Sequence, residues 1–256
     1  MNIDKNIDID IDIDIDIDIV IPAYFEGESI IELLDSLEKY VQSKIRVLLC
    51  YDLEEDDTLS AIRAHPKYSF EIVFLRNKGI GLHGAVITGF NSSTAKSIIM
   101  MPADDSWNAR IIDQMFKMQS NGADIVCPSR FMKNGSVEGY PALKLLIVRI
   151  AAFCLYQLAF IPTQDPTNGF RCFSRRVIDN IPIKSTIGGT FSIELLVKCH
   201  RLGWNIEEIP SRWIERDKGK SKFKLWNWIP FYLKWFFYGF ATTFLFKRKV
   251  ELKDEC

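Results

Sequence analysis

Two adjacent carboxylates, Asp104 and Asp105, follow the apolar segment 97–101. A carboxylate at the end of a buried strand can hold a hard divalent cation such as Mg²⁺ or Mn²⁺. Such a cation can bridge two phosphates and neutralise a leaving group. Two acidic residues near a turn are by themselves more often a solvated loop. Asp52 directly follows another apolar segment, 45–50, and this second strand end favours a shared site for a metal and a nucleotide.

Asp52 and two further loops supply candidate groups for binding a substrate. Asp52 can accept hydrogen bonds from a uracil or guanine edge or from a ribose. The glycines after segment 71–76 allow the backbone to approach a ligand closely, although glycines alone are weak evidence. Another loop follows the first apolar run and precedes a helix. The candidate substrate-binding residues of these two loops are Pro22, Tyr24, Glu26, Asn77, Gly79 and Gly81.

The elements that must position these residues alternate between strand-like and helix-like patterns. Short apolar runs predict strands, and stripes of apolar residues at helical spacing predict helices between them. This order predicts an α/β fold with a mostly parallel twisted sheet and helices on both faces. Ligands of such sheets bind beyond the carboxyl ends of the strands. The predicted strands are 19–21, 45–50, 71–76, 97–101 and 123–127, and the predicted helices begin near 29, 82 and 111.

The chain divides into a tail, one catalytic domain and a C-terminal segment. Residues 1–18 form a low-complexity tail of repeated Ile-Asp, in which a carboxylate at every second position predicts disorder or an extended edge. Residues 19–223 form the domain. Its second half contains a polar loop at 163–171, a helix near 191–202 and a strand near 206–214.

Two long apolar stretches, 143–161 and 225–246, have two interpretations. They can be buried core helices, or they can meet a membrane as a possible interface helix at 141–161 and an aromatic segment within 224–256. The longest uninterrupted apolar run, 235–246, is short for a membrane span. Many aromatic residues with flanking Lys and Arg are typical of the headgroup level. We therefore expect an interfacial or re-entrant hairpin.

Composition limits the remaining classes of function. The 32 Lys and Arg nearly cancel the 33 Asp and Glu, which gives no support to a general nucleic-acid binder. Six scattered cysteines without a C-x-x-C pair fit a reducing compartment. We find no secretory signal pattern at the start and expect the catalytic part on the cytoplasmic face of a membrane.

Taken together in their order, the motifs resemble the family 2 glycosyltransferases with the GT-A fold. This resemblance rests on Asp52 and on segments 21–28, 76–81 and 103–105. Other motifs narrow it to the dolichol-phosphate mannose synthase-like branch and extend it over residues 19–223. These motifs are Ser129-Arg130, 165–171, Glu194, 208–210 and 216–223.

The resemblance implies an inverting hexosyl transfer from a nucleotide-sugar, of the GDP-mannose or UDP-glucose type, to a polyprenyl phosphate at a membrane surface. It also implies Mg²⁺ or Mn²⁺. Asp104 matches the second Asp of the family's Asp-x-Asp metal motif, and Pro102 stands where many relatives carry the first. Either Asp104 holds the metal with fewer protein ligands or Asp105 helps. Further residues matched to the site are Ala103 and Arg171 for binding and Arg130, Arg216 and Lys222 around the phosphates.

Two other functions fit the same sequence. A family 2 transferase acting on a glycan hydroxyl in polysaccharide synthesis would need a carboxylate base, for which Glu194 and Asp165 are available. A non-catalytic nucleotide-sugar-binding subunit would explain Pro102.

Overall fold

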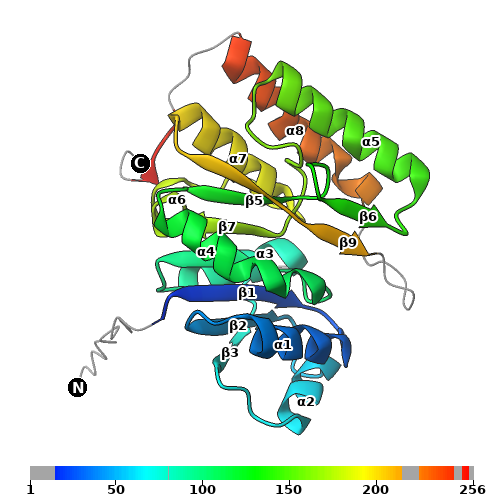
Figure 1. Cartoon of the computed structure of the whole chain (residues 1–256), viewed down its shortest axis with the longest axis vertical. Coiled ribbons are helices and arrows are strands. Elements are labelled where there is room, and N and C mark those ends of the chain that lie inside the picture. Colours follow the sequence, from blue (N-terminus) through cyan, green and yellow to red (C-terminus); the bar gives the residue numbers. More distant parts are fainter. Residues whose placement is uncertain (1–14, 80, 215–224, 245–249, 254–256) are drawn as a thin grey trace, which may run out of the picture.

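A seven-stranded sheet runs through the protein in the order β3-β2-β1-β4-β7-β5-β8 (Figure 1). The computed structural model describes residues 15–79, 81–214, 225–244 and 250–253. Only β7 runs against its neighbours, pairing antiparallel with β4 and β5, so the predicted mostly parallel α/β sheet is confirmed. The strands are β1 (Ile17–Ala23), β2 (Ile45–Tyr51), β3 (Glu71–Arg76), β4 (Ser97–Met100), β5 (Ile125–Ser129), β7 (Arg171–Ser174) and β8 (Ile206–Pro210).

Helices cover both faces of this sheet because β1 is apolar on both sides. Ile19 and Ile21 belong to a core shared with α1 (Ser29–Tyr40), α2 (Asp57–Ala64) and α4 (Ile112–Ser120). Val20 belongs to the opposite core, shared with α3 (Gly81–Ser92), α6 (Arg175–Asn180) and α7 (Thr190–Leu202). An apolar run without polar alternation is the pattern expected of a strand buried on both faces.

The second half of the chain adds smaller elements around this sheet. A two-stranded parallel sheet joins β6 (Ser136–Glu138) to β9 (Arg212–Ile214), so the strand predicted at 206–214 is divided after Pro210. The 3₁₀ turn η1 (Trp107–Ile111) precedes α4, and the π-helical segment η2 (Cys154–Leu158) extends α5 (Ala142–Phe153). Figure 1 shows α5 and α8 (Leu225–Phe244) at the end of the molecule opposite β2, β3 and α2.

The first strand begins at Ile17, two residues before its predicted start, and takes in a buried carboxylate. Asp18 is fully buried and accepts two hydrogen bonds from Arg46, at 2.9 and 3.1 Å. Ser93 Oγ donates to it at 2.7 Å and the Ala95 amide at 3.0 Å. Burial acts to raise the pKa of Asp18, but these hydrogen bonds outweigh it and hold the pKa below its ordinary value. The end of the Ile-Asp repeat is therefore part of the core.

We predict that Asp18→Asn lowers the free energy of unfolding at pH 7 by about 2 kcal/mol, because the buried donors lose their charged acceptor. The folded pKa lies below the unfolded one, so this contribution is present above about pH 4 and is lost as the pH falls through the folded pKa. Urea unfolding at several pH values measures it. Glu32→Gln, on an exposed position of α1, is the control. A deficit of equal size at pH 7 and below pH 4 would contradict the assignment.

Candidate active site

The polar loops predicted from the sequence converge on one edge of the sheet. The first, second, third and fourth loops are the segments that follow β1, β2, β3 and β4. Strand pairing sets Ala23 beside Tyr51 and Tyr51 beside Arg76, so the first three loops leave the sheet at the same height. The Met101 amide still donates to Val20 O at 3.0 Å, which brings the fourth loop to the same edge. Parallel strands present their carboxyl ends together, and this edge is where the fold class binds ligands.

Asp52 and Asn77 form a hydrogen-bonded pair that joins the second and third loops. Asn77 Nδ2 donates to Asp52 Oδ1 at 2.5 Å and to Gly81 O at 3.1 Å, and the Gly79 amide donates to Asn77 Oδ1 at 2.7 Å. Asn77 therefore shapes the glycine loop and orients Asp52 at the same time. Gly81 has a φ of 57°, a left-handed conformation that glycine adopts without strain.

Two acidic residues that follow β2 hold the backbone of the first loop. The amide of Phe25 donates to Asp56 at 3.0 Å, and that of Gly27 donates to Asp57 at 3.0 Å. Asp56 also caps α2 by accepting from the Thr58 amide. The carboxylates of Asp56 and Asp57 therefore stabilise the backbone of the first loop and the start of α2. Among the predicted residues of the first loop, Pro22 and Glu26 are half-buried and Tyr24 is 48% exposed.

The fourth loop presents its two carboxylates differently. Asp104 is half-buried, whereas Asp105 is buried and both of its oxygens accept from Asn108 Nδ2, at 2.7 and 2.8 Å. Burial raises the pKa of Asp105 to about 7, with the Asn108 hydrogen bond opposing it and the charge of Asp104 adding to it. Ala103, also predicted as a binding residue, is buried in the core under α1 and α4.

Arg130 and Asp165 form a second pair at this edge. The guanidinium binds the carboxylate in two places, Nε to Oδ2 at 2.6 Å and Nη2 to Oδ1 at 2.9 Å, and the Arg130 amide also donates to Oδ2. Asp165 is fully buried and the Arg130 side chain is 9% exposed. The pair fixes the segment after β5 to the loop before β7.

Of the other predicted basic residues, Arg171 begins β7 at this edge, beside Met100 at the end of β4. Arg171 is fully buried, and its guanidinium donates to backbone oxygens of Ser192 and Pro166 at 2.7 and 3.1 Å. It therefore braces the loop that carries Asp165. Arg216 and Lys222 lie outside the described residues.

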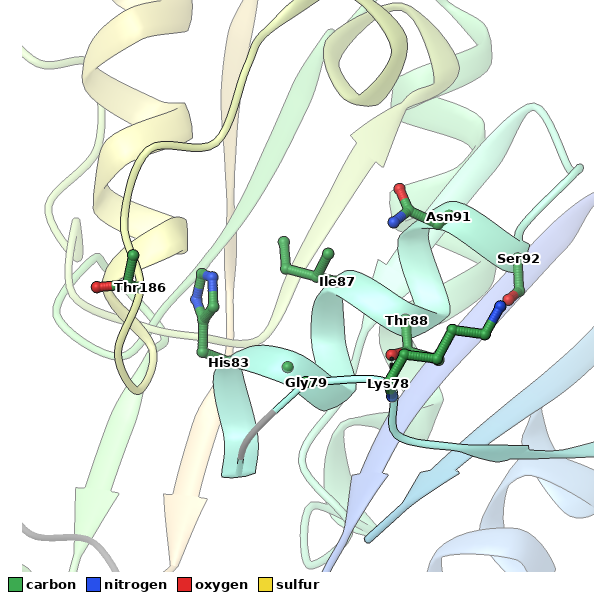
Figure 2. Close-up of a pocket in the computed structure, with 9 residues that line it drawn as sticks. Lys78, Gly79, His83, Ile87, Thr88, Asn91, Ser92 and Thr186 are labelled. Atoms are coloured by element: carbon green, nitrogen blue, oxygen red, sulfur yellow. Dashed lines mark hydrogen bonds between the residues drawn. The ribbon is translucent and has the colours of Figure 1, made fainter.

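A hollow of about 440 Å³ adjoins the glycine loop on the side of α3. Lys78 and Gly79 belong to the glycine loop and also line the hollow. Figure 2 shows His83 beside Thr186, from the loop before α7, and Lys78 extending along α3 towards Ser92. His83 Nδ1 is buried without a hydrogen-bond partner, and burial lowers the pKa of this imidazole while the charge of Glu194 opposes the shift.

Sequence reasoning missed Asn108, which bridges Asp105 to the backbone of β9. Its amide also donates to Arg212 O at 2.8 Å, and the Arg212 amide donates back to Asn108 Oδ1 at 3.1 Å. The only local signal was an Asn three residues after an Asp, which is common in loops. Its partner strand lies over a hundred residues away in the chain.

Several known proteins are similar to this chain over most of its length. Over 211 residues the chain is 28% identical to a dolichol-phosphate mannosyltransferase of Pyrococcus furiosus, covering 80% of this chain and 58% of that protein. It is 25% identical to a polyprenol monophosphomannose synthase of Mycolicibacterium smegmatis, covering 79% of each. It is 28% identical to an undecaprenyl-phosphate mannosyltransferase of Micrococcus luteus, covering 79% of this chain and 85% of the relative.

A solved structure shares the fold at much lower identity. Glucosyl-3-phosphoglycerate synthase from Mycobacterium tuberculosis, in complex with Mn²⁺, UDP-glucose and phosphoglyceric acid, superposes with a TM-score of 0.66 and 13% identity, over 90% of this chain and 82% of that one. The family model for glycosyl transferase family 2 matches residues 18–181, which contain the Asp52–Asn77 pair, the Asp104 loop and the Arg130–Asp165 pair. The chain therefore belongs to glycosyl transferase family 2.

Proposed function

We propose that this family 2 transferase moves a hexose from a nucleotide-sugar to a polyprenyl phosphate with inversion at the anomeric carbon. Three relatives named for transfer of mannose to isoprenoid phosphates favour mannose over glucose as the sugar. The observation that carries the proposal is structural. The Arg130–Asp165 pair at the donor edge is linked through Phe131 to a helix, α5, whose exposed side is apolar.

The donor nucleotide binds at the carboxyl ends of β1, β2 and β3. Asp52, oriented by Asn77, accepts hydrogen bonds from the base or ribose. Pro22, Tyr24, Glu26 and the glycine loop form the walls around it. The hollow beside Lys78 and Gly79 leaves space next to this nucleotide.

Asp104 is the residue that holds the divalent cation, Mg²⁺ or Mn²⁺. The described residues contain no group of three or more His, Cys, Asp or Glu side chains arranged to hold a metal. One carboxylate still fits, because Mg²⁺ is often bound through one or two carboxylates together with substrate phosphates. When bound, the cation neutralises the charge that develops on the departing diphosphate. Asp105 supports Asp104 through its contact with Asn108.

The reaction needs no general base. A lipid phosphate is already ionised at neutral pH, so one of its oxygens attacks the anomeric carbon while the bond from that carbon to the diphosphate breaks. The products are a nucleoside diphosphate and a glycosylated polyprenyl phosphate. Catalysis then depends on positioning and on cationic side chains around the phosphates. Arg130, Arg216 and Lys222 are the residues proposed for that task.

The lipid acceptor reaches this site along an apolar helix surface. On α5, the exposed side chains Leu143, Leu146, Ile147 and Ile150 recur at helical spacing, with exposures of 65, 55, 39 and 55%. Ala152 is instead buried. An apolar stripe directed away from the core indicates a membrane or a partner. Exposed residues that continue it are Phe153, Tyr156, Leu158 and Phe160 after the stripe and Phe231, Leu233 and Phe237 on α8.

Phe131 connects this apolar helix surface to the site. Its ring lies 5.2 Å from the guanidinium carbon of Arg130 and 5.3 Å from that of Arg149 on α5. No helix within the described ranges is long and apolar enough to cross a bilayer. From the exposed apolar stripe of α5 we propose that this helix lies in the interface, at the cytoplasmic face, with the phosphate of the acceptor next to Arg130.

We predict that Leu146→Asp combined with Ile150→Asp reduces binding to anionic lipid vesicles at least about tenfold, since a carboxylate on this stripe opposes burial in the acyl region. Flotation of purified protein with vesicles measures the bound fraction. Gln114→Asp, on an exposed position of α4, adds the same kind of charge elsewhere and leaves flotation unchanged. Equal flotation of the double variant and this control would exclude α5 as the membrane contact.

Incubation with a panel of radiolabelled nucleotide-sugars and either polyprenyl phosphate or a soluble glycan tests the function itself. The expected product is label that extracts with the lipid and is released by mild acid. Label found only on the glycan would support the polysaccharide alternative. That alternative is disfavoured because Glu194 is buried against Lys198 at 2.5 Å and Asp165 is bound to Arg130, so neither carboxylate is placed as a base.

A further inference from the structure

Asn108 ties the loop of the two carboxylates to β9 with every polar group of its side chain. It is 2% exposed. Its oxygen accepts from the Arg212 amide at 3.1 Å, and its nitrogen donates to Arg212 O at 2.8 Å and to Asp105 at 2.7 Å. One primary amide has two donor hydrogens and one acceptor oxygen, so all of them have partners here.

The orientation of this amide is fixed by its surroundings. If oxygen and nitrogen were exchanged, the nitrogen would face the Arg212 N–H and the oxygen would face both Arg212 O and the Asp105 carboxylate. Each of those contacts would pair donor with donor or acceptor with acceptor. The Asn108 side chain therefore makes the same pair of hydrogen bonds to Arg212 that a neighbouring strand would make with β9. Its second amide hydrogen binds Asp105.

We propose that Asn108 is a positioning residue that keeps the Asp104 carboxylate in place by fixing its loop to β9. On one side of it, Asp105 is the direct neighbour of Asp104. On the other side, Asn108 holds the backbone of Arg212 in β9. The inference rests on the proposed function, since Asp104 is the group that Asn108 would keep in place.

The expected signature is a split between rate and affinity. Displacement of reacting groups by about 1 Å costs on the order of a hundredfold in rate. Asn108→Ala keeps Asp104, Asp52 and the glycine loop, so kcat should fall about a hundredfold while KM for the nucleotide-sugar changes less than about threefold. A residue that only stabilised the fold would lower the amount of active enzyme without changing kcat per folded molecule.

A reciprocal exchange keeps the test independent of simple loss of folding. Asn108→Asp alone sets two carboxylates against each other and should be at least as impaired as Asn108→Ala. Adding Asp105→Asn restores an amide donor opposite a carboxylate, and the new carboxylate still accepts from the Arg212 amide. The donation to Arg212 O is lost equally in the single and the double variant, so their difference reports the 105–108 pair alone. The double variant should recover at least about tenfold in kcat over Asn108→Asp, the sign of a direct pair interaction.

Asp124→Ala is the matched control at the opposite edge of the sheet. Asp124 is also buried, and it also joins separate segments, accepting from Ser174 Oγ at 3.3 Å and from the Asn205 amide at 3.0 Å. It should keep wild-type kcat per folded molecule. Hydrogen exchange followed by mass spectrometry should show joint loss of protection in 104–108 and 211–214 for Asn108→Ala only, and this readout needs no acceptor.

The outcomes separate the two proposals. If the wild type transfers sugar and Asn108→Ala has the same kcat, or if the double variant is no better than Asn108→Asp, the positioning role is wrong. If the wild type does not transfer to lipid but the two segments lose protection together, the clamp stands and the proposed acceptor fails. If Asn108→Ala leaves hydrogen-exchange protection unchanged in 104–108 or in 211–214, Asn108 does not join the two segments, whichever acceptor the enzyme uses.

Discussion

Replacing Asp104 by Ala should lower turnover at least about a thousandfold while nucleotide affinity falls far less and the fold is retained. Loss of the metal ligand removes counter-charge from the departing diphosphate, where charge develops only as the bond breaks, and about 4 kcal/mol of transition-state stabilisation corresponds to that factor. We assign this role to Asp104 because the side chain of Pro102 has no ligand atom and both oxygens of Asp105 accept from Asn108. Steady-state transfer at saturating Mg²⁺ or Mn²⁺ measures the loss.

Two controls make this result specific. Asp113→Ala removes an acidic residue that binds the Gln42 and Ser43 amides before β2, at the other edge of the sheet, and should leave turnover unchanged. Asp105→Ala should be less impaired than Asp104→Ala, because it removes only the contact with Asn108 and leaves the Asp104 carboxylate in place. Full turnover of Asp104→Ala, or of the wild type in excess chelator, would exclude the metal role.

The main architecture could be predicted because its signals are local. Residues 19–21 of β1, 47–50 of β2 and 98–100 of β4 are apolar without alternation. The loops that lead from such parallel strands to the next helices must emerge at a common edge. Register then places Asp52 next to Asn77, although neither residue alone indicates the other. The polar loops were predicted at the correct edge for this reason.

Elements that depend on distant partners could not be predicted. β7 is four residues long and begins at Arg171, directly after a polar loop, so its pairing between β4 and β5 leaves little local pattern. The binding role of Arg171 stays a prediction from the resemblance of motif 165–171, and the sequence does not indicate what the side chain contacts in the fold. Its burial follows from carbonyl groups supplied by α7 and by the loop it ends.

The burial of Asp18 in the Ile-Asp repeat also depends on distant partners and could not be predicted. The uniform alternation of the repeat gives no reason to separate Asp18 from the preceding aspartates. The difference comes from Arg46 on the neighbouring strand and from Ser93, Thr94 and Ala95 after α3, which together turn one carboxylate of the repeat into a buried anchor.

The acceptor side of the site gives the second large effect, with Arg216→Ala and Lys222→Ala each expected to cost about tenfold to a hundredfold in transfer at limiting polyprenyl phosphate. A charge-assisted hydrogen bond to a phosphate in a partly desolvated site contributes roughly 1.5 to 3 kcal/mol, which gives these factors. The double variant should lose about a thousandfold. Both residues belong to segment 215–224, which joins β9, next to the carboxylate loop, to α8 of the apolar helix surface.

The comparison that decides this assignment is between residues of one basic segment. Arg216→Lys should also be impaired, since an ammonium cannot reproduce the two-pronged contact of a guanidinium with phosphate. Lys218→Ala removes a charge from the same segment without a proposed phosphate contact and should stay within about threefold of the wild type, the range of a surface charge. Transfer to a short-chain polyprenyl phosphate in detergent separates a phosphate contact from attraction to anionic headgroups, because detergent removes the membrane. Small and equal losses for Arg216→Ala, Lys222→Ala and Lys218→Ala would mean that the segment is a solvated basic loop, and the lipid phosphate would then have to be held by other residues at the edge, beginning with Arg130.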